Sequence, residues 1–289
     1  MELFNDIAPS IACNNLLNIA VSVGFLKNAV IVALISCLIV LLVILAFVLI
    51  RRIKRRIRHR FQQLFRRWLA DAIVQLALNP NQAFVISPQL TKLLQKRYHR
   101  LLALDELLIC KKYLKGYAMT MVVQLYEQLE LRKETDQKLK SSIWSRVVRG
   151  IQEIYVFDQY DAMDQLFAFA DDDNPYIRSE AHFGVVNLQG FEALRFLKQV
   201  RNSLSDWDQI NLLHQLTLFE ARPLVEMPEW LALENKSVVV FALKLLEAYP
   251  EQQYYELVKA CLDNEDLMVQ KQASRCLDKM DTWIKQQKD

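Results

Sequence analysis

The chain has 289 residues, of which 53% are hydrophobic and 24% are charged, with only five glycines and seven prolines. This composition excludes a disordered or collagen-like chain and disfavours turn-rich all-β folds. The net charge of +3 hides an asymmetry, because residues 1–67 hold 10 Lys and Arg against 2 Asp and Glu. The remaining 26 bases and 31 acids give residues 68–289 a net charge of −5. This mildly acidic body leads us to expect no nucleic-acid partner.

Residues 28–50 form the most apolar segment, 23 residues without a charged side chain. As a helix rising about 1.5 Å per residue, this segment covers a hydrocarbon core of roughly 30 Å. A cleaved signal peptide is disfavoured, because residues 1–27 carry Glu2 and Asp6 and only one cation, Lys27. We therefore predict a transmembrane helix over 28–50 and a short extracytoplasmic segment over 1–27. Within that segment, residues 11–26 are apolar but interrupted by asparagines, which favours an interfacial helix.

Residues 51–69 follow the apolar segment with nine cations and no acid. The positive-inside rule places this end in the cytoplasm and the N-terminus outside. Apolar residues recur at helical spacing among the cations, so the segment is predicted to be an amphipathic juxtamembrane helix. Two interpretations stay open: a topology determinant that packs into the domain, or a binder of anionic lipid headgroups. The candidate headgroup-binding residues are Arg51, Arg52, Lys54, Arg55, Arg56, Arg58, Arg60, Arg66 and Arg67.

The rest of the chain is predicted to be all-α. Segments of about 10 to 20 residues show apolar side chains at three- and four-residue spacing, and they are separated by polar or Pro/Gly breaks such as Asn79-Pro80-Asn81. Residues 70–155 are assigned to a helical subdomain or N-terminal cap, and residues 156–289 to a set of repeats.

The repeats have a period of about 31 residues. An apolar position recurs with spacings of 30, 31 and 31 at Ile177, Trp207, Val238 and Val269. Four residues after each of these stand Ala181, Asn211, Ala242 and Ala273. One step further back lie Val147 and Ile151. Each unit is a helical hairpin too small to bury its own apolar face, so stacked hairpins would form one continuous core, an α-solenoid.

The unit at 172–181 resembles the HEAT-like family of α-solenoids. The resemblance rests on Asp172 with Arg178 six residues later, on Ala181, and on the entry to the next hairpin at 190–194. It covers about residues 155–281. In that family the aspartate and arginine form a ladder along the array, but here the arginine position reads Asp208, Val239 and Gln270 in the later units. As a whole the chain is similar to bacterial membrane-anchored HEAT-repeat proteins, which implies a single-pass protein of the bacterial inner (plasma) membrane with a cytoplasmic C-terminal domain.

No catalytic signature is present in the sequence. The four histidines are scattered, no His/Cys set has the spacing of a zinc site, and no glycine-rich phosphate loop or serine-nucleophile motif occurs. We therefore predict no catalytic residue, no cofactor, no metal and no small-molecule substrate, and a protein that is not an enzyme.

The predicted function is a non-enzymatic scaffold or accessory subunit whose solenoid binds a membrane or membrane-proximal protein. A more specific version assigns the partner to an envelope-polysaccharide enzyme or export system. The alternatives are a HEAT-like enzyme with a cleft between repeats, or an anionic-lipid surface sensor. Candidate partner contacts are the positions flanking the repeat signature, which we expect to be exposed: Arg178, Glu180, His182, Asp208, Gln209, Lys236, Lys244, Gln270 and Lys271.

Overall fold

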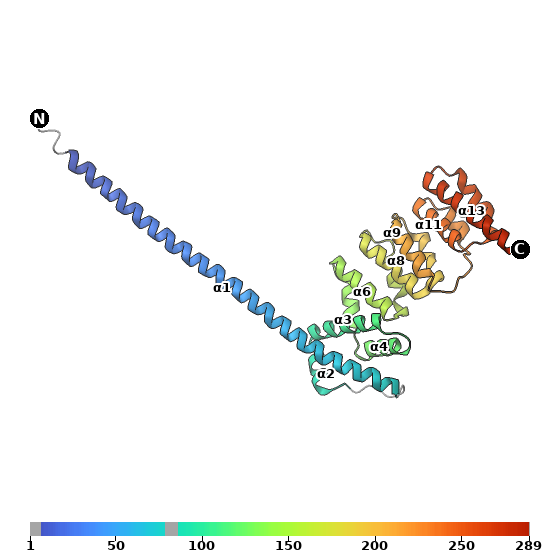
Figure 1. The fold of residues 1–289 in the computed structure, drawn as a ribbon, viewed down its shortest axis with the longest axis horizontal. Coiled ribbons are helices and arrows are strands. Elements are labelled where there is room, and N and C mark those ends of the chain that lie inside the picture. The colour runs from blue at the N-terminus through green and yellow to red at the C-terminus, as the bar shows by residue number, and fades with distance from the viewer. Residues whose placement is uncertain (1–6, 79–85, 289) are drawn as a thin grey trace. The chain divides into compact units, whose positions relative to one another are not determined.

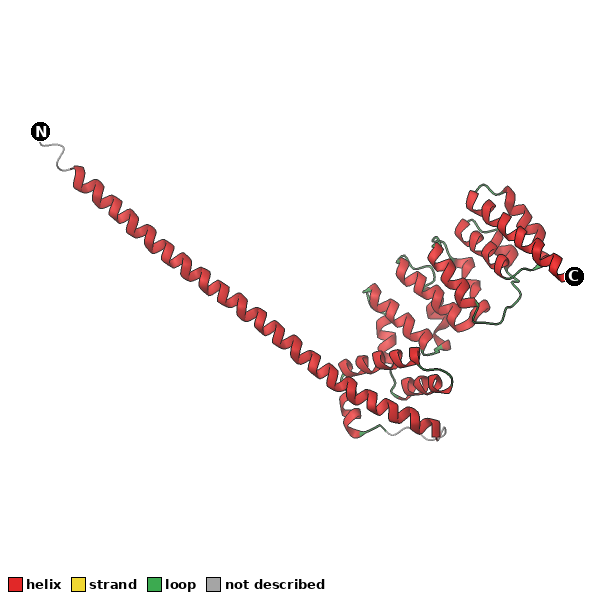
Figure 2. Cartoon of the chain, in the orientation of Figure 1, coloured by secondary structure: helices red, strands yellow, loops and turns green. Residues whose placement is uncertain are grey.

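The computed structural model describes residues 7–78 and 86–288. All regular secondary structure in these two stretches is helical, and neither contains a strand (Figure 2). The predicted all-α class is therefore confirmed for the described residues. In chain order the elements, with 3₁₀ helices marked η, are α1 (Ile7–Leu78), α2 (Pro88–Leu94), α3 (Arg97–Tyr113), α4 (Tyr117–Gln128), α5 (Arg132–Leu139), α6 (Trp144–Val156), η1 (Tyr160–Ala162), α7 (Met163–Ala168), α8 (Pro175–Gln189), η2 (Gly190–Gln199), α9 (Asp206–Leu216), α10 (Met227–Leu231), α11 (Lys236–Ala248), η3 (Gln252–Tyr254), α12 (Tyr255–Ala260), η4 (Cys261–Asp263) and α13 (Leu267–Lys288).

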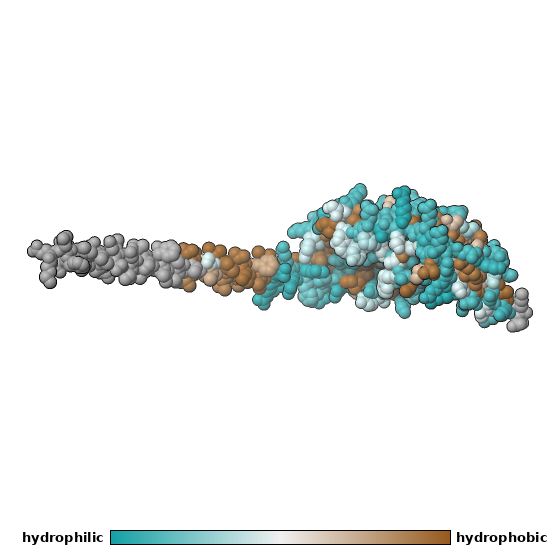
Figure 3. All heavy atoms as spheres, turned by 90° about the horizontal axis from the view of Figure 1, so that it is seen from above, coloured by the Kyte–Doolittle hydropathy of each residue, from teal (hydrophilic) through white to brown (hydrophobic). Residues whose placement is uncertain are grey.

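The first helix is a single uninterrupted element of 72 residues. The predicted boundaries at 27/28, 50/51 and 69/70 therefore do not coincide with breaks in the helix, and residues 11–26 are part of α1 rather than a separate helix. The helix continues through the asparagines of that segment. Part of α1 is long and apolar enough to cross a membrane. Figure 3 shows this part as a brown surface that gives way to teal at the arginine-rich segment. The break predicted at Asn79-Pro80-Asn81 lies outside the described residues.

Two compact units make up the chain, residues 1–67 and residues 68–289. In the second unit, α6 packs against α5 and α8, α8 packs against α9, and α11 packs against α13 (Figure 1). One hydrophobic core runs through these helices from Leu139 to Met280. The helices α2 to α6, which the sequence left as a cap or subdomain, belong to the same unit as the helices that follow them.

The connections between the long helices are shorter and less regular than the predicted hairpins. The 3₁₀ helix η2 lies between α8 and α9. The helices that precede α8, α11 and α13, namely α7, α10 and α12, contain only five or six residues each. Gly190 ends α8 with φ +58°, a conformation that glycine adopts without strain. A Cβ atom there would lie 2.8 Å from the ring of Phe219. The tight turn thus depends on glycine both for its backbone angle and for the space beside it.

The predicted repeat register holds for three of its four units. Ile177, Val238 and Val269 are buried, as are the alanines four residues after each. Trp207, however, is 69% exposed, so its assignment to the core is wrong. The capping residues show why. Asn174, Ser205 and Asn235 are the N-caps of α8, α9 and α11, and the residue three positions after Ser205 is Asp208 rather than Trp207. The second of the four units is therefore shifted by one residue, and Leu212 takes the buried position that the alanines hold elsewhere.

Side-chain amides and carboxylates join the turns of successive units. The Asp171 carboxylate accepts hydrogen bonds from the backbone N–H of Arg201 at 2.9 Å and of Asn202 at 3.3 Å. In the turn before α11, the side-chain amide of Asn235 donates to the backbone carbonyls of Val200 at 3.0 Å and Asn202 at 2.9 Å. These bonds satisfy backbone groups that lie outside any helix, and they fix the spacing of the turns before α8, α9 and α11.

Candidate protein-binding surface

Large apolar side chains are exposed where several of the long helices begin. We call these positions the apolar edge. Single exposed apolar side chains are common on soluble surfaces. These positions, however, fall at the same place in different helices, namely the cap or the first few residues after it, and apolar side chains that gather in this way are typical of contact sites. The apolar edge consists of Ile143, Trp144, Tyr176, Trp207, Ile210, Leu267 and Met268.

Two members of the apolar edge contact each other across neighbouring helices. Trp144 in α6 and Tyr176 in α8 stack with ring centroids 4.8 Å apart and planes 22° apart. The two rings nevertheless remain 46% and 62% exposed. Stacking holds them in a fixed orientation, so a partner that covers them does not have to order flexible side chains first.

Beside the apolar edge, α6, α8 and α9 enclose a pocket of about 300 Å³, which we call the acidic pocket. Its carboxylates come from Glu180 in α8 and Asp208 in α9. The Tyr155 hydroxyl donates to Glu180 Oε1 at 2.8 Å, and the Ser179 hydroxyl donates to the Asp208 carboxylate. Burial raises the pKa of both Tyr155 and Glu180. The pocket therefore places one partly desolvated carboxylate and one helix-capping carboxylate next to aromatic rings.

A second pocket of about 460 Å³, which we call the basic pocket, opens along α6. Three cations line it, namely Lys111, Lys112 and Arg149. Lys111 forms an ion pair with Asp158. Gln152 and Tyr155 line both pockets, so the basic and the acidic pocket adjoin across α6. The surface thus changes the sign of its charge from one pocket to the next. This alternation suits a charged polypeptide better than an apolar small molecule.

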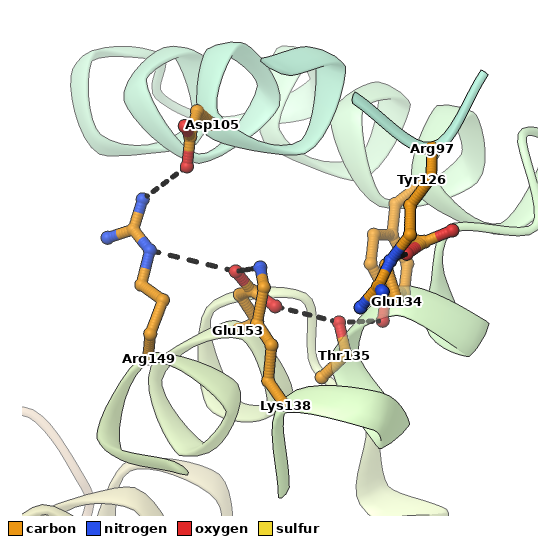
Figure 4. Close-up of polar contacts among 8 residues, drawn as sticks. All are labelled: Arg97, Asp105, Tyr126, Glu134, Thr135, Lys138, Arg149 and Glu153. Carbon is orange, nitrogen blue, oxygen red and sulfur yellow. Dashed lines mark hydrogen bonds and ion pairs between the residues drawn. The ribbon is translucent and has the colours of Figure 1, made fainter. Parts of the chain in front are cut away.

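A buried polar network connects α6 to α3, α4 and α5 (Figure 4). At its centre is Glu153, whose side chain is fully buried and forms an ion pair with Lys138. Thr135 Oγ1 donates to Glu153 Oε2 at 2.9 Å and accepts from the Tyr126 hydroxyl at 3.1 Å. Arg149 Nε lies 3.6 Å from Glu153 Oε1. Every polar group shown around Glu153 has a partner, as a stable buried charge requires.

Burial raises the pKa of the Glu153 carboxyl, whereas Lys138, Thr135 and Arg149 act in the opposite direction. A buried carboxylate with a raised pKa can mark a catalytic acid or base. Here the side chain has no exposed surface and its oxygens already have partners, so a substrate would have no access to them. Arg149 also donates to Asp105 Oδ1 at 3.0 Å, which joins α3 to α6. The network thus has a structural role and positions the basic pocket.

The structure brings some of the predicted contact residues together. Glu180 and Asp208 line the acidic pocket. Lys236 is exposed and lines a separate pocket of about 430 Å³ beside Met268 of the apolar edge. Lys271 is also exposed. These four residues remain candidates for contact with a partner.

Other predicted contacts are engaged within the domain. Arg178 Nη1 donates to the Asp172 carbonyl at 2.5 Å, so the family-like pair is bonded through the backbone rather than through the carboxylate. Gln270 Nε2 donates to the Asn264 carbonyl at 2.6 Å. Lys244 Nζ donates to Gln209 Oε1 at 2.8 Å. Arg178 and Gln270 stabilise the turns before their helices and Lys244 joins α11 to α9, which leaves less of their polar surface for a partner.

Two of the predicted contacts are buried, so the exposure expected of them is wrong. His182 is 1% exposed, because its ring stacks on Phe196 with centroids 4.5 Å apart and its Nε2 bonds the Ala170 carbonyl at 2.7 Å. Gln209 is 2% exposed, because its side chain turns back to donate to the Leu204 carbonyl at 3.1 Å. A partner cannot reach either side chain in this fold.

Sequence reasoning missed the apolar edge. It assigned Trp207 to the core and did not single out Trp144, Tyr176 or Met268. The signal that could have located Trp207 is the capping residue Ser205, since counting from the caps places Trp207 two residues into its helix, as Tyr176 is in α8. The stacking of Trp144 on Tyr176 has no comparable signal, because it depends on how α6 and α8 cross.

The predicted headgroup residues are exposed along α1, all nine of them. The Arg51 guanidinium lies 4.4 Å from the centroid of the Phe47 ring, at the end of the apolar segment. Contacts of this kind allow an arginine to cover an apolar surface while its charge remains in water.

Among the residues searched for a metal site, which exclude the parts of the chain that the structure does not describe, no group of three or more His, Cys, Asp or Glu side chains could hold an ion. No protein-family model matches this chain. No curated protein sequence matches it significantly. The function therefore has to be argued from the surface itself.

Proposed function

We propose that the protein is a non-enzymatic, membrane-anchored scaffold or accessory subunit that binds another membrane or membrane-proximal protein. In this proposal the apolar part of α1 crosses a bacterial inner membrane once, with the N-terminus outside. The second unit is a HEAT-like α-solenoid in the cytoplasm. The observation that carries the proposal is the apolar edge, because exposed large apolar side chains at the starts of several helices are typical of a protein-binding surface.

The repeated caps support the solenoid interpretation. The N-caps Asn174, Ser205 and Asn235 follow each other at intervals of 31 and 30 residues. Hydrogen bonds from Asp171 and Asn235 link the turns before these helices. In a solenoid, one side of each helix start would face solvent, so equivalent side chains would form a row for a partner to contact.

The scaffold proposal predicts that a charged side chain introduced into the apolar edge prevents the protein from binding its partner. The full-length protein carrying a C-terminal tag is purified from native membranes in mild detergent, and copurifying proteins are quantified by mass spectrometry. We expect one near-stoichiometric membrane protein, an envelope-polysaccharide enzyme or export component in the more specific version. Tyr176→Glu or Met268→Glu should abolish its recovery.

The matched control is Leu218→Glu, which adds the same charge at a side chain that is 68% exposed outside the apolar edge. Recovery of the partner should be unchanged in this variant. Equal recovery in the wild type and in Tyr176→Glu and Met268→Glu would contradict the proposal, as would loss of the partner in all three variants.

Lipid binding is a second candidate function, and the exposure of all nine juxtamembrane cations favours it. Each cation near an anionic surface contributes on the order of 1 kcal/mol. A soluble peptide of residues 51–69 is a sufficient probe, with sedimentation on vesicles of neutral or anionic phospholipid. Binding that requires anionic lipid and weakens steeply with salt supports this role, whereas equal binding to both vesicles contradicts it.

A further inference from the structure

We propose that the acidic pocket binds an arginine side chain of the partner protein. This inference rests on the proposed function, because it names the chemistry of one contact that the partner makes. The pocket combines two carboxylates with an exposed tryptophan, and it lies next to the apolar edge that would bring the partner's backbone close.

The first step of the argument concerns charge. Among the described residues, neither Glu180 nor Asp208 forms an ion pair, although both line the same cavity. The nearby cation Arg178 is instead bonded to the Asp172 carbonyl. Partial burial disfavours the ionised form of Glu180, whose pKa it raises. A cation that entered the pocket would offset this cost, because it would replace the lost hydration of the carboxylate.

The second step concerns hydrogen-bonding capacity. Glu180 accepts from the Tyr155 hydroxyl and from the side chain of Gln152. The Asp208 carboxylate accepts from the Ser179 hydroxyl and from both the hydroxyl and the backbone N–H of Ser205. An ionised carboxylate has about four acceptor sites, so both groups retain acceptor capacity for a ligand. A guanidinium group offers five N–H donors in a plane and can bond two carboxylates at once.

The third step concerns the walls of the cavity. Trp207 is 69% exposed and lines the pocket beside the two acids. Tyr155 and Phe183 form a further wall, with ring centroids 5.4 Å apart in an edge-to-face arrangement. A guanidinium stacks on an aromatic face while its edge bonds a carboxylate, a combination that the compact ammonium of lysine cannot match. The volume of about 300 Å³ is at the lower end for ligand sites and suits a single long side chain.

The experiment uses the full-length protein in nanodiscs of neutral lipid, labelled with 5-fluorotryptophan. The Trp207 resonance is assigned by its absence in Trp207→Leu. The probe is N-acetyl-arginine methylamide, and its comparison compound is the citrulline analogue, which has the same shape but no charge. We expect the arginine probe to shift the Trp207 resonance saturably and the citrulline analogue to have no effect.

Glu180→Gln should weaken binding of the arginine probe about tenfold, because it removes a charge-assisted hydrogen bond but can still accept from Tyr155. Glu256→Gln, an exposed carboxylate in α12 away from the pocket, should leave the affinity unchanged. An unshifted Trp207 resonance, equal effects of the arginine and citrulline probes, or equal affinity in Glu180→Gln would each overturn the proposal. Probe binding is measured without any partner, so its failure is distinguishable from a failure to recover a partner from membranes.

Discussion

Gln209 holds in α9 the position that Arg178 holds in α8, and both side chains donate to a backbone carbonyl of the turn before their own helix. Arg178 bonds the Asp172 carbonyl at 2.5 Å and Gln209 bonds the Leu204 carbonyl at 3.1 Å. Gln270 does the same in α13, where it bonds the Asn264 carbonyl at 2.6 Å. A long donor side chain one turn into the helix is thus a recurring way of fixing the entry to these helices. The requirement is for a donor rather than for a positive charge.

This relationship predicts that Gln209→Leu destabilises the protein. The substitution removes both the donor to the Leu204 carbonyl and the acceptor for Lys244 Nζ. A lost buried hydrogen bond costs about 1 to 2 kcal/mol. Urea unfolding of the full-length protein in detergent, followed by fluorescence, measures the change in the free energy of unfolding. Gln137→Leu makes the same substitution at an exposed position in α5 and should have little effect. Equal losses in the two variants would mean that the hydrogen bonds of Gln209 contribute nothing specific.

The sequence was sufficient to predict the elements whose signals are local. Periodic apolar residues and capping residues such as Asn174 and Asn235 indicate where α8 and α11 begin, and a period near 31 places the buried Ile177, Val238 and Val269 in equivalent positions. The same reasoning placed Trp207 wrongly, because it aligned units by hydrophobicity and a tryptophan stood one residue from the true position. The turn before α9 shifts the register, and hydrophobicity alone does not detect such a shift.

The candidate site was less predictable, because it depends on contacts between elements. Glu180 and Asp208 were singled out as separate exposed residues, but only the packing of α6, α8 and α9 makes them face one cavity with Tyr155. His182 was expected on the surface, yet its ring lies against Phe196, fourteen residues later in the sequence. No periodicity reports such a contact, since it is set by the way η2 folds back on α8.

The Glu153 network predicts a strong dependence of stability on one buried carboxylate. Glu153→Gln keeps the size of the side chain but removes the charge that pairs with Lys138 and Arg149. Breaking a buried pair leaves the remaining cation without compensation, and we expect a loss of about 3 kcal/mol. Urea unfolding measures the loss.

The control for this variant is Glu192→Gln. Glu192 also forms an ion pair, with Arg222, but both side chains are about 60% exposed. Solvent screens such pairs, so the change in unfolding free energy should be below about 1 kcal/mol. A loss in Glu153→Gln as small as in the control would contradict a structural role for the buried network.

Two glycines with positive φ allow backbone strain to be separated from crowding. Gly116 has φ +60° with no atom within 4 Å of an added Cβ, whereas at Gly190 that atom would lie 2.8 Å from Phe219. Gly116→Ala should therefore cost about 1 kcal/mol from the backbone conformation alone. Gly190→Ala should cost roughly 1 to 3 kcal/mol more, because the Phe219 ring has to move. Thermal unfolding of the two variants tests this order, and equal losses would show that Phe219 moves aside at no cost.

The buried imidazole of His182 predicts a loss of stability in mild acid. Burial lowers the pKa of His182 to about 4, from 6.5 for an ordinary histidine. The carbonyl of Ala170 can only accept, so Nε2 carries the proton of the neutral ring, and in the described structure Nδ1 has no hydrogen-bond partner. The unfolded chain therefore binds a proton that the folded protein does not bind between pH 6.5 and about 4. The free energy of unfolding should fall as the pH is lowered through this window, by about 3 kcal/mol in total, at 1.36 kcal/mol per pKa unit.

His182→Gln tests this contribution, because glutamine can still donate to the Ala170 carbonyl but does not titrate. The wild type and the variant are unfolded in urea at about pH 7 and about pH 5, and the difference between their pH dependences isolates the histidine from the carboxylates that titrate in both. The wild type should lose more stability than His182→Gln on acidification. His214→Gln, at an exposed histidine in α9, should keep the pH dependence of the wild type. Parallel acid profiles for the wild type and His182→Gln would mean that the His182 ring gains solvent access when it is protonated, and that the contact with Phe196 does not hold it in the neutral form.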